Sequence, residues 1–232
     1  MSSDTLTGKL LGMLAHDLRT PLSSILLHLE LLESASGLTS DEKEDVAYAL
    51  ASARALAEMI DLAVDAVRGV APSVGQHDLA AIAREAAEHL TATGSRHPIE
   101  VDGPDTLPVR CDHRLTLRAI RQLVAGARAV TPGDRTVKVK LSADERHGRV
   151  EVVDEGVAIP DALRERLFDA AGAVEIRAEH RSLSRGIGPV FCRGVTRAQG
   201  GEAGVESDPE APERRGNVFW ITVPLGHAST DP

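Results

Sequence analysis

The 232-residue chain has few aromatic residues and cysteines and no long uninterrupted apolar run. Aromatic residues make up 2% of the chain, whereas apolar residues as a whole make up 42%. A core can therefore form, but its side chains must be almost entirely aliphatic. The two cysteines, Cys111 and Cys192, are too few to hold a secreted fold together and lack metal-ligand spacing, which indicates thiols in a reducing compartment.

The chain also lacks an excess of basic residues. It has 26 Lys and Arg against 35 Asp and Glu, a formal net charge of -9. Nucleic-acid-binding domains normally carry a basic face, so we expect no nucleic-acid partner. No segment approaches the roughly 18 apolar residues of a membrane span, and the short apolar stretch at 9–15 has no cleavage-site pattern after it. The composition predicts a cytoplasmic protein without a membrane partner.

Apolar residues at helical spacing dominate the first third of the chain. In the first segment they step by three or four positions: Leu11, Leu14, Leu18, Leu22, Ile25, Leu29 and Leu32. A polar turn follows, in which Ser40 or Asp41 can cap a second helix. The second helix has its own seam: Val46, Leu50, Ala53, Ala57, Ile60, Val64 and Val67. Two amphipathic helices joined by a short turn make a helical hairpin.

One hairpin leaves its apolar stripe half covered. Two hairpins together make a four-helix bundle, so we predict a homodimer formed through residues 8–68. The alternative is a hairpin that folds back on the C-terminal part of its own chain.

Residues 68–78, RGVAPSVGQHD, contain glycine and proline without periodicity, as is typical of a domain boundary. The predicted domains are therefore a helical domain at 1–70, a linker at 71–77, a second domain at 78–226 and a tail at 227–232. In the second domain, predicted helices at 78–92, 112–130, 160–168 and 187–199 alternate with short strands. The strands lie near IEVD, PVRCD, TVKVKLS, RVEVVDEG, EAGVES and NVFWITVPL. This order favours an α+β fold, a sandwich with helices on one face of a mostly antiparallel sheet.

His16 lies on the first predicted helix, at the start of the segment HDLRTPL. Two positions separate it from Leu14 and from Leu18, so it points about 200° away from each of them, toward solvent. The adjacent Asp17 can hold one imidazole tautomer or accept its proton, which leaves the other ring nitrogen nucleophilic.

A cation, a hydroxyl and a proline complete the segment. Arg19 and Thr20 follow His16 by three and four positions, so both can share its face. Such groups suit an anionic transferred group, such as phosphoryl, and an attacking water. Pro21 cannot donate a hydrogen bond to the carbonyl of Asp17 and its ring crowds that carbonyl, so we expect the helix to bend at the His16 turn.

The motif HDLRTPL resembles the phosphoacceptor motif of bacterial sensor histidine kinases, which lies in the hairpin that dimerises and transfers phosphoryl groups. The resemblance implies that His16 is phosphorylated, that Asp17 acts as a base, and that Thr20 positions water for dephosphorylation of a response regulator. It also implies the receiver domain of that regulator as the partner.

Residues 77–226 resemble the ATP-binding domain of the same family in the order and spacing of its motifs. The helix RAIRQLVAGARAVTPG aligns with the family's asparagine box, where Gln122 replaces the first asparagine and Gly126 the second. The second asparagine is the family's magnesium ligand. Glycine offers no side-chain oxygen to a hard cation, which puts Mg²⁺ binding in doubt.

The two glycine boxes of the family are only partly retained. DEGVAIP matches the first box: it keeps Asp154, which the family uses to accept a hydrogen bond from adenine, and Gly156, but has Ala158 in place of a glycine. The second box keeps two glycines and has a serine in place of a third: Gly186, Gly188 and Ser184. ATP binding is therefore expected to be weakened.

Between the two boxes the family's phenylalanine is present as Phe168. Alanines stand where the family has aromatic and basic residues shortly after it: Ala170, Ala171 and Ala173. The basic residues that follow either attract phosphate or form a solvated loop: His180, Arg181 and Arg185.

Three functions remain open at this point. In the first, a pseudokinase or phosphotransferase exchanges phosphoryl between His16 and receiver aspartates, and the second domain docks partners. In the second, an active autokinase and phosphatase uses divergent metal and lid residues, with a part for Gln122. In the third, the chain is a non-catalytic scaffold. The intact His16 segment and the losses around the nucleotide favour the first, and the 15 residues before His16 suggest that input comes from a partner protein or an upstream phosphodonor.

Overall fold

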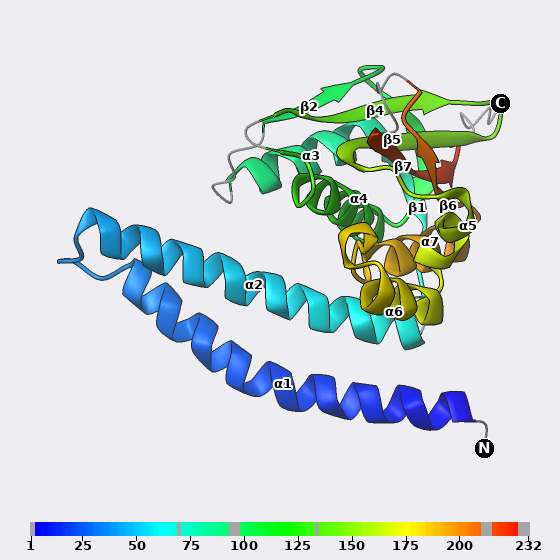
Figure 1. The fold of residues 1–232 in the computed structure, drawn as a ribbon. Coiled ribbons are helices and arrows are strands. Elements are labelled where there is room, and N and C mark those ends of the chain that lie inside the picture. Colours follow the sequence, from blue (N-terminus) through cyan, green and yellow to red (C-terminus); the bar gives the residue numbers. More distant parts are fainter. Residues whose placement is uncertain (1–2, 69–70, 93–97, 133–134, 210–214, 227–232) are drawn as a thin grey trace. The chain divides into compact units, whose positions relative to one another are not determined.

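A computed structural model of the protein describes residues 3–68, 71–92, 98–132, 135–209 and 215–226 (Figure 1). The chain divides into two compact units, Met1–Gly69 and Val70–Pro232. The predicted tail at 227–232 lies outside the described residues. None of the helices in the described ranges is long and apolar enough to cross a membrane.

The first unit is a helical hairpin of α1 (Ser3–Glu33) and α2 (Ser40–Arg68). Thr39, rather than the predicted Ser40 or Asp41, caps α2. The carboxylate of Glu42 accepts hydrogen bonds from the backbone N–H of Thr39 at 2.8 Å and from its hydroxyl at 2.9 Å. The hydroxyl in turn accepts from the N–H of Glu42 at 3.3 Å. These reciprocal bonds form a capping box, which fixes where the second helix begins.

One apolar stripe joins the two helices. Its buried members are Ala15, Leu22, Ala53, Ile60 and Val64, with Leu26, Leu29 and Ala57 partly buried against them. The predicted seam of α2 is present at four of these positions, but most of the predicted seam of α1 is not part of the contact. The half-exposed members of that predicted seam are Leu14, Leu18, Ile25 and Leu32. The first helix therefore carries two neighbouring apolar stripes. The spacing of the apolar residues is the same in both, so it does not predict which stripe faces α2.

Pro21 does not break α1. The helix runs continuously from Ser3 to Glu33 with the proline inside it, and it curves along its length (Figure 1). The helix is therefore curved around the proline, and it is not divided into two helical segments.

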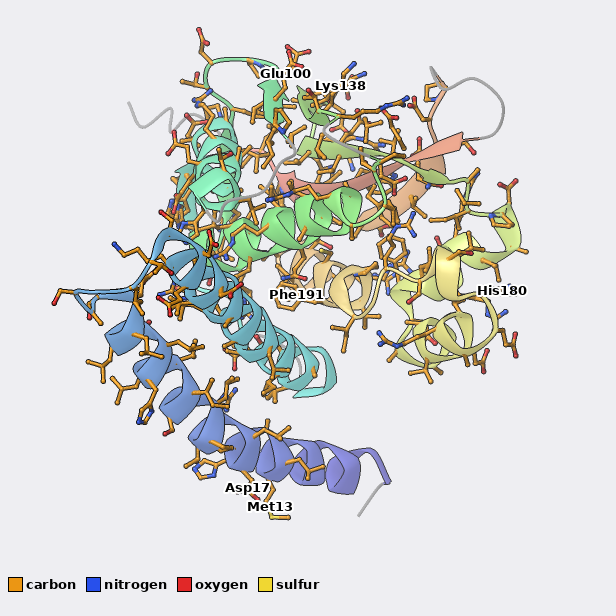
Figure 2. The ribbon with its side chains drawn as sticks, turned by 60° about the vertical axis from the view of Figure 1, so that its left-hand side comes forward. Met13, Asp17, Glu100, Lys138, His180 and Phe191 are labelled. Carbon is orange, nitrogen blue, oxygen red and sulfur yellow. The ribbon has the colours of Figure 1, made fainter. Side chains whose placement is uncertain are left out.

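The second unit is built on a five-stranded sheet whose spatial order is β2-β4-β5-β7-β6. The strands are β2 (Ile99–Asp102), β4 (Val137–Ala143), β5 (His147–Val157), β7 (Arg215–Pro224) and β6 (Ala203–Ser207). β2 pairs with β4 in parallel, which places Glu100 beside Lys138 (Figure 2), and the other three pairs are antiparallel. The sheet is therefore mostly antiparallel, as the sequence predicts.

Three helices cover one face of this sheet (Figure 1): α3 (Leu79–Ala92), α4 (His113–Arg128) and α7 (Gly188–Ala198). The core between the layers is aliphatic, with Ile120, Val152 and Ile221 nearly inaccessible to solvent, and it includes both free cysteines. The structure confirms the predicted α+β sandwich.

Two elements differ from the sequence expectation. β1 (Gly75–Asp78) pairs antiparallel with β3 (Pro108–Cys111), so residues 75–77 are a strand rather than part of the linker. α6 (Ala170–Glu179) is a helix in a segment for which the sequence predicts no helix. Its alanines have high helix propensity, and Asp169 caps it by accepting a hydrogen bond from the N–H of Gly172 at 2.9 Å. Shorter turns flank α6: α5 (Asp161–Arg164), η1 (Glu165–Phe168) and η2 (Arg181–Leu183).

Asp112 connects α4 to the first residues of the second unit. Its buried carboxylate caps α4 by accepting from the N–H of Leu115 at 3.0 Å and also accepts from the N–H of Ser73 at 2.8 Å. Burial acts to raise the pKa of this carboxyl, but the two backbone hydrogen bonds and the charge of Arg114 outweigh it and hold the pKa below its ordinary value. The charged form of Asp112 therefore stabilises the fold.

Candidate functional site

The imidazole of His16 stands free of the core on α1. Its side chain is 80% exposed, and its Nδ1 lies 3.3 Å from Oδ1 of Asp17. Figure 2 shows Asp17 and Met13 projecting from α1 on the side away from α2. Among the described residues, Nε2 of His16 has no partner. The arrangement agrees with the predicted outward direction of the ring and leaves one nitrogen open to a partner molecule.

Thr20 and Arg19 differ in their relation to His16. The hydroxyl of Thr20 donates to the backbone carbonyl of His16 at 3.4 Å, so it stays on the same turn. The guanidinium of Arg19 instead reaches α2, where Nε and Nη2 donate to Oδ1 of Asp61 at 3.0 and 2.5 Å. Its charge is therefore matched by Asp61 and joins the two helices. Asp61 could not be predicted from the sequence of the first helix, because a partner 42 residues away carries no local signal.

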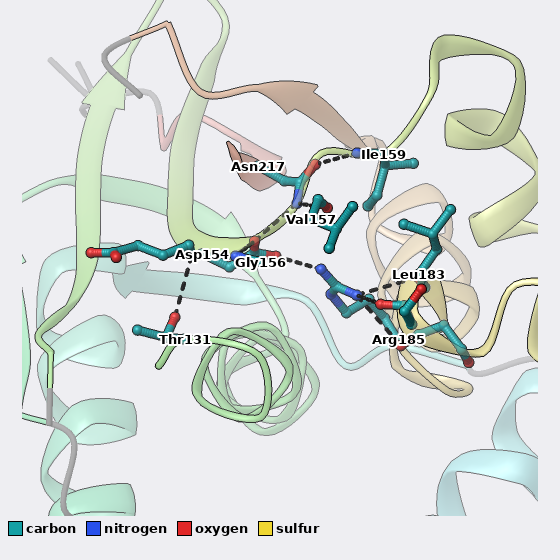
Figure 3. Close-up of polar contacts among 11 residues, drawn as sticks. Thr131, Asp154, Gly156, Val157, Ile159, Leu183, Arg185 and Asn217 are labelled. Carbon is teal, nitrogen blue, oxygen red and sulfur yellow. Dashed lines mark hydrogen bonds and ion pairs between the residues drawn. The ribbon is translucent and has the colours of Figure 1, made fainter. Parts of the chain in front are cut away.

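In the second unit the predicted adenine acceptor, Asp154, is completely buried and fully engaged (Figure 3). One carboxylate oxygen, Oδ1, accepts from the N–H of Gly156 and from Nδ2 of Asn217, both at 2.9 Å. The other, Oδ2, accepts from Nη2 of Arg185 at 3.1 Å. A buried carboxylate needs such partners, because an unpaired buried charge is costly.

Arg185 is the unexpected member of this cluster. Its side chain is 3% exposed, so it belongs neither to a solvated loop nor to a surface that attracts phosphate, the two expectations from the sequence. Its Nη1 is also close to the backbone carbonyls of Ser182, Leu183 and Ser184, at 3.3–3.5 Å. The ion pair with Asp154 joins positions 31 residues apart.

Asn217 is a second residue that sequence reasoning missed. It is buried on β7, and its amide donates to Asp154 and to the carbonyl of Val157, while its Oδ1 accepts from the N–H of Ile159 at 2.8 Å. A polar amide at the start of the apolar strand NVFWITVPL was the available signal. Asn217 holds the loop after Asp154 against the sheet.

One of the predicted nucleotide residues, Gly186, lines an open cavity of about 280 Å³. Its lining includes Gly126, Gly186 and Arg185. Gln122 lies next to this group: its Oε1 is 3.5 Å from where a Cβ on Gly188 would stand. Asp154, Gly156 and Gly188 do not line this cavity, so the structure places only part of the aligned motif residues around it.

The residues at the predicted metal position do not fit a magnesium site. Gly126 has no side chain, and nothing lies within 4 Å of the place where its Cβ would be. Gln122, one helical turn earlier on α4, offers an amide oxygen but no carboxylate. Octahedral Mg²⁺ usually requires one or two carboxylates in addition to water and phosphate ligands. Within the described ranges, no group of three or more His, Cys, Asp and Glu side chains is arranged to hold a metal ion.

Two family models match this chain. Residues 7–69 match the His Kinase A (phospho-acceptor) domain, and residues 111–227 match the histidine kinase-, DNA gyrase B-, and HSP90-like ATPase. The probable sensor histidine kinase TcrY of Mycobacterium tuberculosis is 25% identical over 97% of this chain and 47% of its own length. The adaptive-response sensory kinase SasA of Synechococcus sp. is 28% identical over 94% of this chain and 59% of its own length. The chain thus spans about half the length of the curated relatives it matches.

Solved structures share the fold. Full-length ShkA in complex with AMPPNP aligns with a TM-score of 0.65 over 94% of this chain and 46% of that chain, at 22% identity. The histidine kinase AdeS of Acinetobacter baumannii aligns with a TM-score of 0.56 over 91% of this chain and 98% of that chain, at 16% identity. At these identities the likeness concerns the fold alone.

Proposed function

This chain belongs to the bacterial sensor histidine kinase family of two-component signalling proteins, and we propose that it exchanges phosphoryl between His16 and the aspartate of a response-regulator receiver domain. In this proposal the phosphoryl group enters from a phosphorylated partner rather than from ATP bound to the same chain. The observation that supports it most is the contrast between the exposed His16–Asp17 pair and the fully engaged Asp154.

The chemistry follows from the position of Asp17. With its carboxylate beside Nδ1, the neutral imidazole keeps its proton on Nδ1 and presents the lone pair of Nε2. Nε2 attacks the phosphorus of a receiver aspartyl phosphate, so an N–P bond forms while the O–P bond breaks and the aspartate leaves as a carboxylate. Asp17 then stabilises the positive charge of the phosphorylated ring or accepts the Nδ1 proton. In this scheme Thr20 positions the water that dephosphorylates a receiver, and Arg19 joins the two helices.

The second apolar stripe of α1 supports a homodimer. Leu14, Leu18, Ile25 and Leu32 are each about half exposed, although they lie on one side of the helix. A second hairpin packed on this stripe would bury it and complete a four-helix bundle. His16 is two positions from both Leu14 and Leu18, so it would remain on the outside of that bundle, within reach of a receiver.

Nucleotide use is the step that we propose to be impaired. The family of the second unit generally binds ATP. In this chain Gly126 supplies no metal ligand, and Asp154 is fully buried with Arg185 on Oδ2 and Asn217 on Oδ1. A metal clamp on the phosphates contributes several kcal/mol to phosphoryl transfer, so its loss by itself slows autophosphorylation by orders of magnitude.

The test follows labelled phosphoryl from two donors. The purified chain is incubated either with labelled ATP and magnesium or with a labelled, phosphorylated receiver. His16→Ala removes the proposed acceptor. The matched control is His28→Ala, because His28 is also exposed on α1 but has no acid beside it and bonds through Nδ1 to the carbonyl of Ser24 at 2.7 Å.

We expect label from the receiver on the wild-type chain and on His28→Ala, none on His16→Ala, and little or none from ATP. Rapid labelling of His16 from ATP would refute the proposal in favour of an autokinase. If the chain accepts label from neither donor, no phosphoryl chemistry takes place at His16 and the chain acts as a scaffold.

A further inference from the structure

We propose that Arg185 is an internal ligand of Asp154 that closes the inner end of the 280 Å³ cavity to a nucleotide base. This inference deepens the proposed function, because it names the residue that keeps the second unit from using ATP. It rests on the contacts of the guanidinium, on the space it occupies and on the size of the cavity that remains.

The contacts show an ion pair inside the protein rather than on its surface. The side chains of Arg185 and Asp154 are 3% and 0% exposed, and Nη2 lies 3.1 Å from Oδ2. With Gly156 and Asn217 on Oδ1, the carboxylate accepts three hydrogen bonds. A base that donated to Asp154 would have to displace Arg185 from Oδ2. Removing a guanidinium from a buried carboxylate is unfavourable unless the carboxylate finds an equally good partner.

The space for the guanidinium exists because residue 156 is glycine. A Cβ on Gly156 would lie 2.9 Å from Nη2 of Arg185, 2.9 Å from Cγ2 of Val130 and 3.1 Å from Oδ1 of Asp154. The glycine of the first box therefore lets the arginine approach, and here it serves the ion pair. The guanidinium also lies 5.8 Å from the centre of the Phe219 ring, so an aromatic face covers its other side.

Arg185 is held in place, but not every donor of its guanidinium group has a hydrogen-bond partner. Its Nε is buried and has no hydrogen-bond partner within the described part of the chain. A buried donor without a partner destabilises the closed pair, which lowers the free energy needed to open it. The ion pair is therefore a barrier that a competing group or a substitution can remove.

The cavity that remains is small for a nucleotide. At about 280 Å³ it lies just below the range of roughly 300–1,000 Å³ that is typical of pockets for small organic ligands. Arg185 lines this cavity and also the smaller one beside Gln122, Pro189 and Phe219. Moving its side chain would join the two spaces and expose Oδ2 of Asp154.

The experiment measures adenosine binding to the full chain by calorimetry. Adenosine has no phosphate, so removing a positive charge does not itself change its affinity through long-range attraction. Arg185→Met removes the guanidinium and keeps an unbranched apolar chain. The matched control is Arg177→Met, because Arg177 lines the same cavity but is exposed and does not contact Asp154. Circular dichroism and thermal unfolding establish that each variant is folded.

If the ion pair must open before a base can bind, the apparent affinity for adenosine is the affinity of the open form multiplied by the fraction of molecules that are open. Arg185→Met removes this requirement and should raise the affinity for adenosine at least about tenfold. Arg177→Met should leave it unchanged, and adding Asp154→Asn to Arg185→Met should abolish the gain. A folded Arg185→Met that binds adenosine no better than the wild type would overturn the inference. If Arg185→Met does not fold, Arg185→Lys decides, because the shorter ammonium cannot hold both Asp154 and the carbonyls of 182–184; equal affinity there would also overturn it.

Phosphoryl transfer from a phosphorylated receiver to His16, measured on the same samples, separates this inference from the proposed function. We expect Arg185→Met and the wild type to transfer at the same rate. Loss of transfer in both would refute the proposed role of His16 and leave the adenosine result to decide the role of Arg185.

Discussion

Replacing Leu18 and Ile25 together by alanine should dissociate the proposed dimer. Both side chains belong to the stripe of α1 that does not contact α2, and they are 53% and 51% exposed in the single chain. Full burial of a leucine or isoleucine contributes about 1.5–3 kcal/mol, so about half of that, roughly 1 kcal/mol, remains to be gained by each side chain in a dimer.

The loss of association free energy is twice the sum for one chain, because the interface of a twofold dimer contains both copies of each residue. Four truncated side chains should cost about 4 kcal/mol of association free energy, or nearly a thousandfold in the dissociation constant, at 1.4 kcal/mol for each factor of ten. Sedimentation equilibrium over a dilution series measures this constant directly. Thermal unfolding at a fixed concentration shows whether the variant hairpin is still folded.

The control is the double variant Leu27→Ala and Leu31→Ala. These leucines are 55% and 59% exposed on the same helix, but Leu27 is two positions from Ile25 and so points about 200° away from it. The control loses the same number of carbon atoms and should dimerise like the wild type. Equal weakening by both double variants, or a wild type that is monomeric at micromolar concentration, would refute the assignment of this stripe to the dimer.

Three further substitutions test other parts of the structure. Asp112→Ala removes the cap of α4 and should lower the free energy of unfolding by about 1 kcal/mol at pH 7. Because the pKa of Asp112 is lowered on folding, this difference between wild type and variant should persist above the ordinary pKa of 3.8 and shrink as the pH falls below it, as urea unfolding at several pH values would show. Gly126→Ala, where a Cβ meets nothing within 4 Å, should stabilise the protein by about 0.5–1 kcal/mol and raise Tm by about 1–4 °C. A lower Tm would mean that the glycine is required. Arg19→Ala and Asp61→Ala should each cost less than about 1 kcal/mol and show coupling in a double-mutant cycle, since their half-exposed ion pair joins the two helices.

The helical hairpin shows what periodicity predicts and what it leaves out. The steps of three and four residues predict both helices, and they predict an exposed His16, although Leu14 and Leu18, from which that direction is derived, are themselves half exposed. They do not distinguish the stripe that packs on α2 from the stripe that remains half exposed, because two apolar stripes on one helix have the same period. Leu22 and Leu29 are predicted correctly as members of the contact between the helices, whereas the burial of Ala15 is not foreseen.

In the second unit the order of motifs predicts the sheet and its covering helices, and two of the aligned residues, Gly126 and Gly186, line one cavity. The Arg185–Asp154 pair could not be predicted, because it joins a loop to a strand end across 31 positions without any local pattern. A basic residue in a glycine-containing loop is ordinarily solvated, and only the tertiary fold shows that this one is buried.

The central claim is that Nε2 of His16 carries the phosphoryl group, and ³¹P NMR tests it most directly, since the two phosphorylated ring positions of histidine have different chemical shifts. The spectrum is recorded after the full chain is mixed with a phosphorylated receiver under alkaline conditions that preserve phosphohistidine. The position of Asp17 beside Nδ1 predicts a single signal from the Nε2 isomer, present in His28→Ala and absent in His16→Ala. A signal from the Nδ1 isomer, or one that persists in His16→Ala, would contradict the account.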